Sequence, residues 1–267
     1  MSAQVWLVFF FTFIIHLIGT LSFALRIAGA RTRKIALSFA LFNILALASR
    51  TAHSFQVPLL AKHVEQNILQ GTLAHAEADF RWLLLAATLA TVLGALLIPT
   101  FQRLLTRAVE AFDVHRSLPR LVARSLSRSG FRQFKESWSW PAKENLTLMM
   151  NAGRVPLRII VANVLATALI SVGAFSSLYA GYLNPALRVT ANSFSPLING
   201  FSTVLLFVYI DPFLSLLTDD VAHDKVSHAR FRSCVILFVL SRLAGTLIAQ
   251  LLFIPASKLI VAAARLL

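Results

Sequence analysis

The sequence predicts an all-α, polytopic membrane protein with six transmembrane helices, and three observations support this fold class. The chain is 57% hydrophobic and 13% charged, with a mean hydropathy of +0.74, whereas soluble domains are about 25% charged. Six apolar windows reach the roughly 20 residues that a spanning helix requires. Basic residues are concentrated in alternate connections between these windows. The windows cover residues 4–25, 35–60, 82–102, 157–182, 192–217 and 233–256.

The first window is expected to be a permanent span. The first 25 residues carry no Lys or Arg, whereas a cleaved signal peptide has a basic start and a short apolar region. Arg50 interrupts the second window and Asp211-Pro212 the fifth. Pro58, Pro99 and Pro255 are expected near helix ends or at kinks, because proline removes a helical hydrogen bond.

The distribution of Lys and Arg predicts the orientation in the membrane. Connections one, three and five carry 18 of these residues, whereas connections two and four and the tail carry 5. The positive-inside rule places the first group in the cytoplasm and both chain termini outside. The net charge of +14 therefore indicates topology and contact with anionic membrane phospholipids, and no nucleic acid partner is expected.

The long third connection divides the chain into a first transmembrane half, 1–102, a basic connection, 103–156, and a second half, 157–267. Arginines recur there at every fourth residue, which places them on one helical face. We expect an amphipathic helix or two on the inner membrane surface, broken near Pro119 and Gly130, with the arginines on lipid phosphates. The alternative is a solvated basic loop. The arginines are Arg116, Arg120, Arg124, Arg128 and Arg132.

The two halves resemble each other at an offset of 154 to 156 residues. Matched pairs include Gly19 with Gly173, Asn43 with Asn199, Pro58 with Pro212 and Pro99 with Pro255. Because each half has three spans, the second half enters the membrane from the opposite side. This pattern is typical of inverted-topology repeats, whose substrate path lies between the halves. Chance matching between apolar sequences is the alternative.

Charged residues inside the spans point to an anion path. A cation at the bilayer centre costs at least about 2.5–3.5 kcal/mol, unless it faces a watery cavity, a counter-ion or an anionic ligand. Arg50 is expected in the outer third of the membrane, and Arg242 and His16 near its midplane. Snorkelling to the surface is the alternative for Arg50, and a structural salt bridge with Asp211 is the alternative for Arg242.

We predict a polar cavity with arginines at successive depths for a negatively charged headgroup, since guanidinium binds phosphate through two parallel hydrogen bonds. Gating or counter-ion roles are predicted for the aspartates near the cytoplasmic end. The predicted substrate-binding residues are Arg50, Arg242, Arg26, Arg31, Arg33, Lys34, Arg188, His16, His53 and Asn43, and the predicted gating or counter-ion residues are Asp211, Asp219 and Asp220.

Other classes of site find little support in the sequence. The stretch TDDVAHDKVSH, residues 218–228, gathers acidic and histidine side chains, but its spacing matches no strong metal template. There is no G-x-x-x-x-G-K-[ST], H-E-x-x-H, C-x-x-C or G-x-S-x-G motif. The single cysteine, Cys234, excludes an intrachain disulfide. We therefore expect no metal, no cofactor and no enzymatic activity.

Two stretches carry a resemblance to a known family. They are RIAGARTRKIALSFALFNILALASRTAHSFQVPLL, residues 26–60, and SLYAGYLNPALRVTANSFSPLINGFSTVLLFVYIDPFLSLLTDDV, residues 177–221. The sequence resembles the Amj family of lipid II flippases, the alternative to MurJ in bacterial cell-wall synthesis. The resemblance implies translocation of an undecaprenyl-pyrophosphate-linked disaccharide-pentapeptide from the inner to the outer leaflet of the cytoplasmic membrane. It supplies no set of substrate residues.

Three alternatives stay open at this point. A secondary transporter of another anionic or polyprenyl-linked lipid needs the same arginines. A non-transporting membrane scaffold of cell-wall synthesis predicts that changes at Arg50 and Arg242 are silent. An enzyme acting on lipid-linked substrates requires an essential carboxylate such as Asp211. Six spans are a small frame for so large a headgroup, which favours a homodimer, and the small-residue step Ser241, Gly245, Ala249 suits close helix packing within or between protomers.

Overall fold

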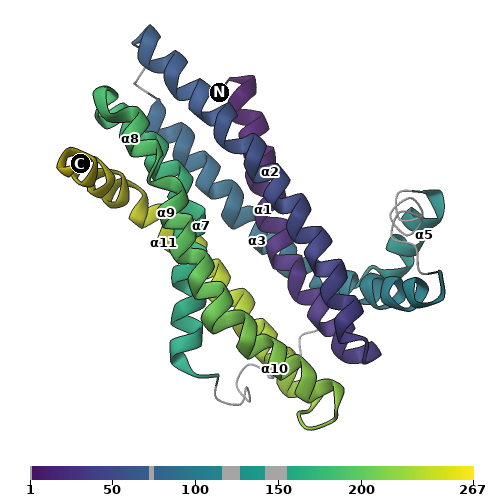
Figure 1. Cartoon of the computed structure of the whole chain (residues 1–267). Helices are drawn as coiled ribbons and strands as arrows, with labels where there is room; N and C mark the ends of the chain where they lie inside the picture. Colours follow the sequence, from purple (N-terminus) through teal and green to yellow (C-terminus); the bar gives the residue numbers. More distant parts are fainter. Residues whose placement is uncertain (1, 72–74, 116–126, 142–154) are drawn as a thin grey trace.

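The computed structural model describes residues 2–71, 75–115, 127–141 and 155–267, and all its regular elements in this part are helical (Figure 1). Six helical segments are long and apolar enough to cross a membrane, which confirms the predicted number of spans. The spans are α1 (Ala3–Thr32), α2 (Ile35–Gln70), α3 (Ala76–His115), α7 (Leu157–Leu183), the fifth segment and α11 (His228–Leu266). The fifth segment joins η1 (Pro185–Leu187), α8 (Arg188–Asn192), α9 (Ser195–Leu205), η2 (Leu206–Ile210) and α10 (Asp211–Ala222).

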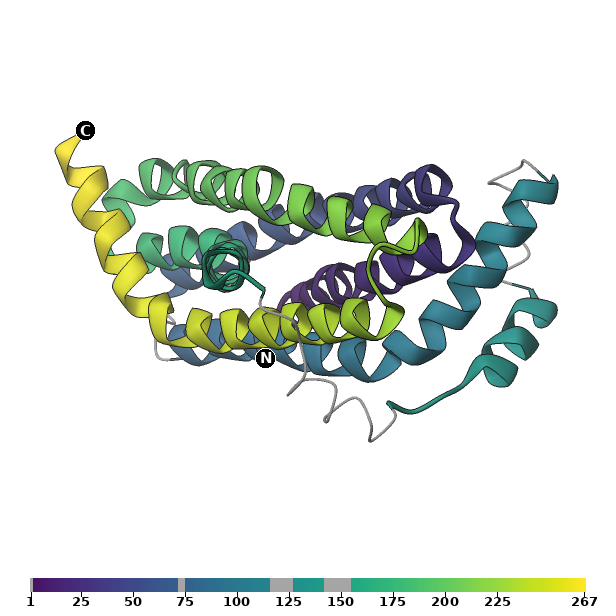
Figure 2. The same ribbon diagram turned by 90° about the horizontal axis from the view of Figure 1, so that it is seen from below.

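The spans form three layers, which Figure 2 shows one above another with the helices running across the view. α1 and α7 make the middle layer, α2 and α8–α10 cover one face, and α3 and α11 cover the other. The most apolar window of α7 is 67% buried, whereas those of α2 and of the fifth segment are each 17% buried. The layer of α2 and α8–α10 is therefore the open side of the molecule.

Both halves follow one packing scheme. α1 packs against α2 and α3, and α7 packs against α9 and α11. Figure 1 shows α1 and α7 running in opposite directions. This is the arrangement that the sequence offset between the halves predicts for an inverted repeat.

The turn between α1 and α2 is tight, and a left-handed residue, a side-chain hydrogen bond and a close contact at a glycine stabilise it. Arg33 ends α1 in the left-handed conformation, with φ of 56°. The Ser38 hydroxyl then donates to the Leu25 carbonyl, and a Cβ at Gly29 would lie 2.8 Å from the Ser38 Cβ. At the far end of α2, Gly71 provides a left-handed cap with φ of 68°, which glycine adopts without steric cost.

The fifth segment changes its helical pitch near Pro212. Proline has no backbone N–H and its ring collides with the carbonyl four residues earlier. The chain adopts a π-helical turn, η2, directly before Asp211 and Pro212. Wider turns of this kind absorb an interruption of the hydrogen-bond ladder and are frequent at functional sites.

Two apolar clusters hold the ends of the bundle and leave a polar band between them. One cluster contains Val8, Phe80 and Phe253 and lies toward the termini. The other contains Phe23, Leu214 and Phe238 and lies toward the opposite end. Buried polar side chains in the intervening band are Thr12, His16, Thr20, Thr88, Thr91, Asn163, Thr167, Ser171, Ser241 and Thr246.

The two ends of the bundle differ in composition and are named here accordingly. Both chain termini, the end of α2 and the start of α3 lie at one end, the terminal end (Figure 1). The α1–α2 turn, the short helix α5 (Arg128–Ser137) and the α10–α11 turn lie at the other, the basic end. The described parts of the three basic connections therefore gather at one end.

The described part of the basic connection has a helix boundary near one predicted break. α5 begins at Arg128, two residues before Gly130, with Ser127 as its N-cap. Arg128 and Arg132 are on α5, whereas Pro119, Arg116, Arg120 and Arg124 lie outside the described residues.

The small-residue step on α11 is used within the chain. Asn163 on α7 donates to the Phe238 carbonyl and to the Ser241 hydroxyl, at 3.0 and 2.7 Å. A Cβ at Gly245 would lie 2.7 Å from the Thr167 Cβ. This step therefore packs α11 on α7 rather than facing a second copy.

Candidate functional site

A polar cavity opens between the two halves on the open side of the molecule. Its volume is about 310 Å³, and it is called the groove cavity below. α1 and α7 form its floor, and α2 and α9 form its walls. The lining residues are Thr12, Ile15 and His16 of α1; Ser49, Arg50, His53, Ser54 and Gln56 of α2; Ile170, Ser171, Ala174 and Phe175 of α7; and Asn199 and Thr203 of α9.

Hydrogen bonds between α1 and α2 fix one wall of the groove cavity. The Gln56 amide donates to the Thr12 hydroxyl at 2.7 Å, and His53 Nδ1 lies 3.1 Å from Gln56 Oε1. Because the Gln56 nitrogen is the donor, its oxygen accepts from the His53 ring. This chain orients His53 toward the cavity.

His16 and Arg50 both line the groove cavity. His16 is 4% exposed and its Nδ1 has no hydrogen-bond partner in the described structure. Arg50 is exposed on the wall, and its guanidinium forms no hydrogen bond or ion pair with any described residue. A polar ligand in this cavity could form hydrogen bonds with the Arg50 guanidinium and with His16 Nδ1. Such bonds would offset the cost of burying unpaired polar groups.

Arg242 crosses the molecule from the opposite layer. It starts on α11 and its guanidinium rests on Gly19 of α1, so that a Cβ at Gly19 would collide with it. It lies within electrostatic range of His16, one turn away on α1. Its Nε is buried without a partner, and no ion pair to a described residue neutralises it. Arg242 therefore places an uncompensated positive charge behind the cavity floor.

The second half places an amide at the matching position. A Cβ at Gly173, which matches Gly19 at an offset of 154 residues, would lie 2.7 Å from Asn199 Oδ1. This oxygen is also buried without a partner in the described structure. Each central helix thus uses its glycine to admit a polar side chain from a neighbouring helix.

Asp211 pairs with Arg26 instead of Arg242. Arg26 donates to Asp211 Oδ1 at 2.5 Å, and the two side chains are 10% and 24% exposed. The salt bridge considered between Arg242 and Asp211 is not formed. Gly19, where Arg242 rests, is seven residues from Arg26 along α1, a separation of about 10 Å at 1.5 Å per residue.

A second ion pair closes the basic end of the groove. Arg33 lies 2.5 Å from Asp224, which belongs to the α10–α11 turn, and both are about two-thirds exposed. Asp219 and Asp220 pair inside their own segment, with His223 at 3.5 Å and Lys225 at 3.8 Å. The contacts across the groove therefore come from Asp211 and Asp224.

Comparison with known proteins places the chain in a family. A family model described as "Amj: Alternate to MurJ" matches residues 11–264. The chain belongs to the Amj family. It is 36% identical over 258 residues to "Lipid II flippase Amj" of Bacillus subtilis (strain 168), covering 95% of this chain and 94% of that protein. No solved structure matches it. The expected resemblance is therefore confirmed.

Some predicted residues lie away from the groove cavity of this Amj-family chain. Asn43 is exposed on α2 and Arg188 is exposed at the start of α8, and neither lines the cavity. Lys34 caps the start of α2 at the basic end. Arg31 is on a different face of α1 and lines a separate pocket with Arg103 and Arg232.

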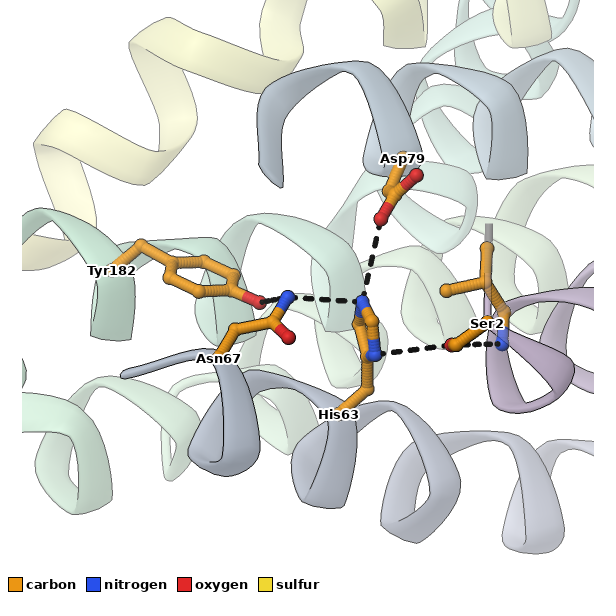
Figure 3. A network of polar contacts seen from close by, with 6 residues as sticks. Ser2, His63, Asn67, Asp79 and Tyr182 are labelled. Carbon is orange, nitrogen blue, oxygen red and sulfur yellow. Dashed lines mark hydrogen bonds and ion pairs between the residues drawn. The ribbon is translucent and has the colours of Figure 1, made fainter. Parts of the chain in front are cut away.

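At the terminal end, a hydrogen-bonded network joins the halves (Figure 3). His63 of α2 lies 3.3 Å from Asp79 of α3 and 3.3 Å from Ser2. Asn67 lies 3.2 Å from the same His63 ring and donates to the Tyr182 hydroxyl of α7 at 3.1 Å. These five residues are called the terminal clasp. Sequence reasoning did not identify it.

The sequence reasoning also missed Gln56, Thr12 and Gly19. A signal for them exists, because Arg50, His53 and Gln56 recur at helical spacing on α2, as do Thr12, His16 and Gly19 on α1. Among the described residues, no group of three or more His, Cys, Asp or Glu has an arrangement that suits a metal ion. Residues 218–228 therefore show no such cluster.

Proposed function

We propose that this protein is a lipid II flippase, which moves the undecaprenyl-pyrophosphate-linked peptidoglycan precursor from the inner to the outer leaflet of the bacterial cytoplasmic membrane. Membership of the Amj family and the name of the Bacillus relative support this. Such a protein relocates its substrate without making or breaking a bond, so it needs no catalytic residue. The observation that carries the proposal is a polar groove, open on one side, which is lined by Arg50 and has Arg242 behind its floor, neither of them paired with an acidic residue in the described structure.

The open side suits a lipid-linked substrate. A flippase must shield a large polar headgroup while the lipid chain stays in hydrocarbon, and a closed pore cannot release that chain sideways. Among the six spans, α2 and the fifth segment have the smallest buried share of their most apolar window. The headgroup is expected to occupy the groove between them, with the polyprenyl chain outside.

Arginines at successive depths are proposed to bind the diphosphate. Arg33 and Arg26 lie at the basic end, Arg242 rests on the middle of α1, and Arg50 lies farther toward the terminal end. Charge-assisted hydrogen bonds from guanidinium offset the desolvation of phosphate. Asp211 and Asp224 occupy the first two arginines until the diphosphate competes for them, which gives these aspartates a counter-ion role.

The basic end is proposed to face the cytoplasm, with both termini outside. The distribution of Lys and Arg supports this orientation. In a Cys234→Ser background, a membrane-impermeant thiol reagent applied to intact cells should label a cysteine at Leu267 and leave one at Lys225 unlabelled. The reverse pattern would overturn the orientation and the direction of transport.

A homodimer is proposed on the size of the substrate relative to six spans. The small-residue step of α11 is occupied by α7, so the contact must use another surface. Single-molecule mass measurement in nanodiscs should find two copies at low protein density. One copy per disc with full transport activity would exclude the dimer.

The function is tested in cells whose only flippase is this protein, by the accessibility of lipid II at the cell surface. Wild type and the control Arg158→Ala, on an exposed residue outside the groove cavity, should present lipid II. Arg50→Ala and Arg242→Ala, at equal expression, should reduce it strongly. Absence of surface lipid II in wild type would overturn the flippase and favour a transporter of another lipid or a scaffold. Unchanged lipid II in both variants would overturn the arginine path alone.

A further inference from the structure

A second large pocket lies on the face opposite the groove cavity. It has a volume of about 690 Å³ and lies at the basic end, between α1, α3, α11 and the segment after α5. It is called the arginine pocket here. Its lining residues are Ile27, Arg31, Ala95, Leu96, Ile98, Pro99, Gln102, Arg103, Ser139, Trp140, Pro141, Arg232, Val235, Ile236, Val239 and Leu240.

Three helices each contribute one arginine to this pocket. Arg31 of α1 lies within electrostatic range of both Arg103 of α3 and Arg232 of α11. None of the three forms an ion pair or a hydrogen bond with a residue in the described ranges, and no carboxylate is among the described residues that line the pocket. Three like charges held together repel one another, so the arrangement favours an anion that bridges them.

The wall of the arginine pocket is fixed by specific contacts. The Ser139 N–H donates to the Thr100 hydroxyl at 3.0 Å, and that hydroxyl donates back to the Ser139 carbonyl at 3.2 Å. Phe101, Phe134, Trp138 and Trp140 form a chain of edge-to-face ring contacts. These contacts hold Trp140 at the pocket, where an exposed indole suits the membrane interface.

Beyond the arginines, the pocket continues as an aliphatic surface. Leu96 and Ile98 of α3 and Val235, Val239 and Leu240 of α11 line this part. A cationic end followed by an apolar wall and an interfacial tryptophan matches a phosphate headgroup with an attached acyl chain. A free anion would leave the apolar part unused. Among the described lining residues, the uncharged side chains that can form hydrogen bonds are Gln102, Ser139 and the Trp140 indole. These are too few to bind a sugar–peptide headgroup.

We infer that the arginine pocket binds an anionic phospholipid, with its phosphate between Arg31, Arg103 and Arg232 and an acyl chain along α3 and α11. The pocket is on another side of α1 from the ion pair that Arg26 forms with Asp211, because Ile27 and Arg31 lie about 100° and 140° around the helix from Arg26 at 100° per residue. The bound lipid offsets part of the repulsion among the three arginines and joins α1 to α3 and α11. The inference does not depend on the identity of the flipped substrate.

The test is lipid binding to the full-length protein, measured by native mass spectrometry with phosphatidylglycerol, phosphatidylcholine, glycerol phosphate or lipid II. The pocket variant is Arg31→Gln/Arg103→Gln/Arg232→Gln. The matched control is Arg158→Gln/Lys225→Gln/Arg230→Gln, which removes the same charge from exposed positions at the same end. Each basic residue near an anionic lipid surface contributes roughly fivefold, so the pocket variant should bind phosphatidylglycerol about 100-fold more weakly. The control should bind it as wild type does.

Several results would overturn the inference. Equal losses in the two triple variants would mean general attraction to the basic end. Equal affinity for glycerol phosphate and phosphatidylglycerol would mean an anion site without a lipid chain. Selective loss of lipid II binding would assign the pocket to the transport path. If the triple variant fails to fold, Arg103→Gln alone should weaken phosphatidylglycerol binding about fivefold, and an unchanged affinity there would also contradict the inference.

Discussion

The basic end of the groove and its middle use arginine in different ways. At the basic end, Arg26 and Arg33 each have an aspartate within 2.5 Å. In the middle, Arg50 and Arg242 have no acidic partner among the described residues, and polar atoms of His16, Asn199 and Arg242 are buried without hydrogen bonds. Paired arginines stabilise the contact between the halves. Unpaired ones retain their capacity to bind an anion, which is why the transport proposal rests on the middle of the groove.

Replacing Arg242 should have the largest effect on transport. Arg242→Gln keeps a long polar side chain against Gly19 and removes the charge. A charge-assisted hydrogen bond contributes about 1.5–3 kcal/mol, so the initial rate of lipid II flipping in proteoliposomes should fall about 10- to 100-fold. Arg158→Gln serves as the control and should keep the wild-type rate. A wild-type rate for Arg242→Gln would place the essential charge elsewhere.

Breaking the partly buried ion pair should mainly affect stability. Asp211→Asn leaves Arg26, which is 10% exposed, without its counter-ion and should lower the free energy of unfolding by about 2 kcal/mol. Asp224→Asn, in the exposed pair with Arg33, should cost at most about 1 kcal/mol. Denaturant unfolding of both variants in detergent measures the contrast. Equal losses would remove the distinction between the two pairs.

Substitution of Gly19 tests the position of Arg242 without altering the arginine itself. A Cβ at Gly19 collides with the guanidinium, whose flexible side chain must then move away. Gly19→Ala should reduce flipping about tenfold, equivalent to about 1.4 kcal/mol, with little loss of stability. Gly200→Ala is the matched control, since nothing lies within 4 Å of a Cβ there. If both variants flip lipid II at the same rate, the guanidinium position on α1 is unimportant.

The terminal clasp should give the smallest effect. Asn67→Ala removes the bond to Tyr182, the contact of the clasp that joins the two halves, and a neutral hydrogen bond contributes about 1 kcal/mol. Hydrogen exchange at the end of α2 and the start of α3 should become faster, with flipping nearly unchanged. Loss of flipping instead would make the clasp part of the transport cycle.

The sequence was sufficient to predict the spans and the central charged residues. Twenty or more apolar residues identify a spanning helix, and Arg50 was expected to face a polar cavity because a cation is costly in hydrocarbon. His16 and His53 were expected to bind the same headgroup. They do converge on the groove cavity. Family membership also followed from the stretches around these residues.

The remaining features depend on which helix faces which neighbour. Arg31 was grouped with Arg26 because both are near the α1–α2 turn, yet five residues rotate a side chain by about 140° around a helix. It therefore lines the arginine pocket instead of the groove. Asp211 was considered as a salt-bridge partner of Arg242, but the sequence does not show toward which helix a side chain points, and Asp211 of α10 pairs with Arg26 of α1. The contact of Arg242 with Gly19 joins helices of two layers. The hydrophobic periodicity of a sequence does not show which helices are neighbours.

Photo-cross-linking tests most directly whether the headgroup passes the unpaired arginines. A cross-linker is placed at Thr203, which lines the groove cavity, or at Leu89, which is 47% exposed on α3 in the opposite layer. Lipid II should be captured from Thr203 and not from Leu89, and capture should be lost in Arg50→Gln/Arg242→Gln. Equal capture at both positions, or undiminished capture from Thr203 in the double variant, would contradict the account.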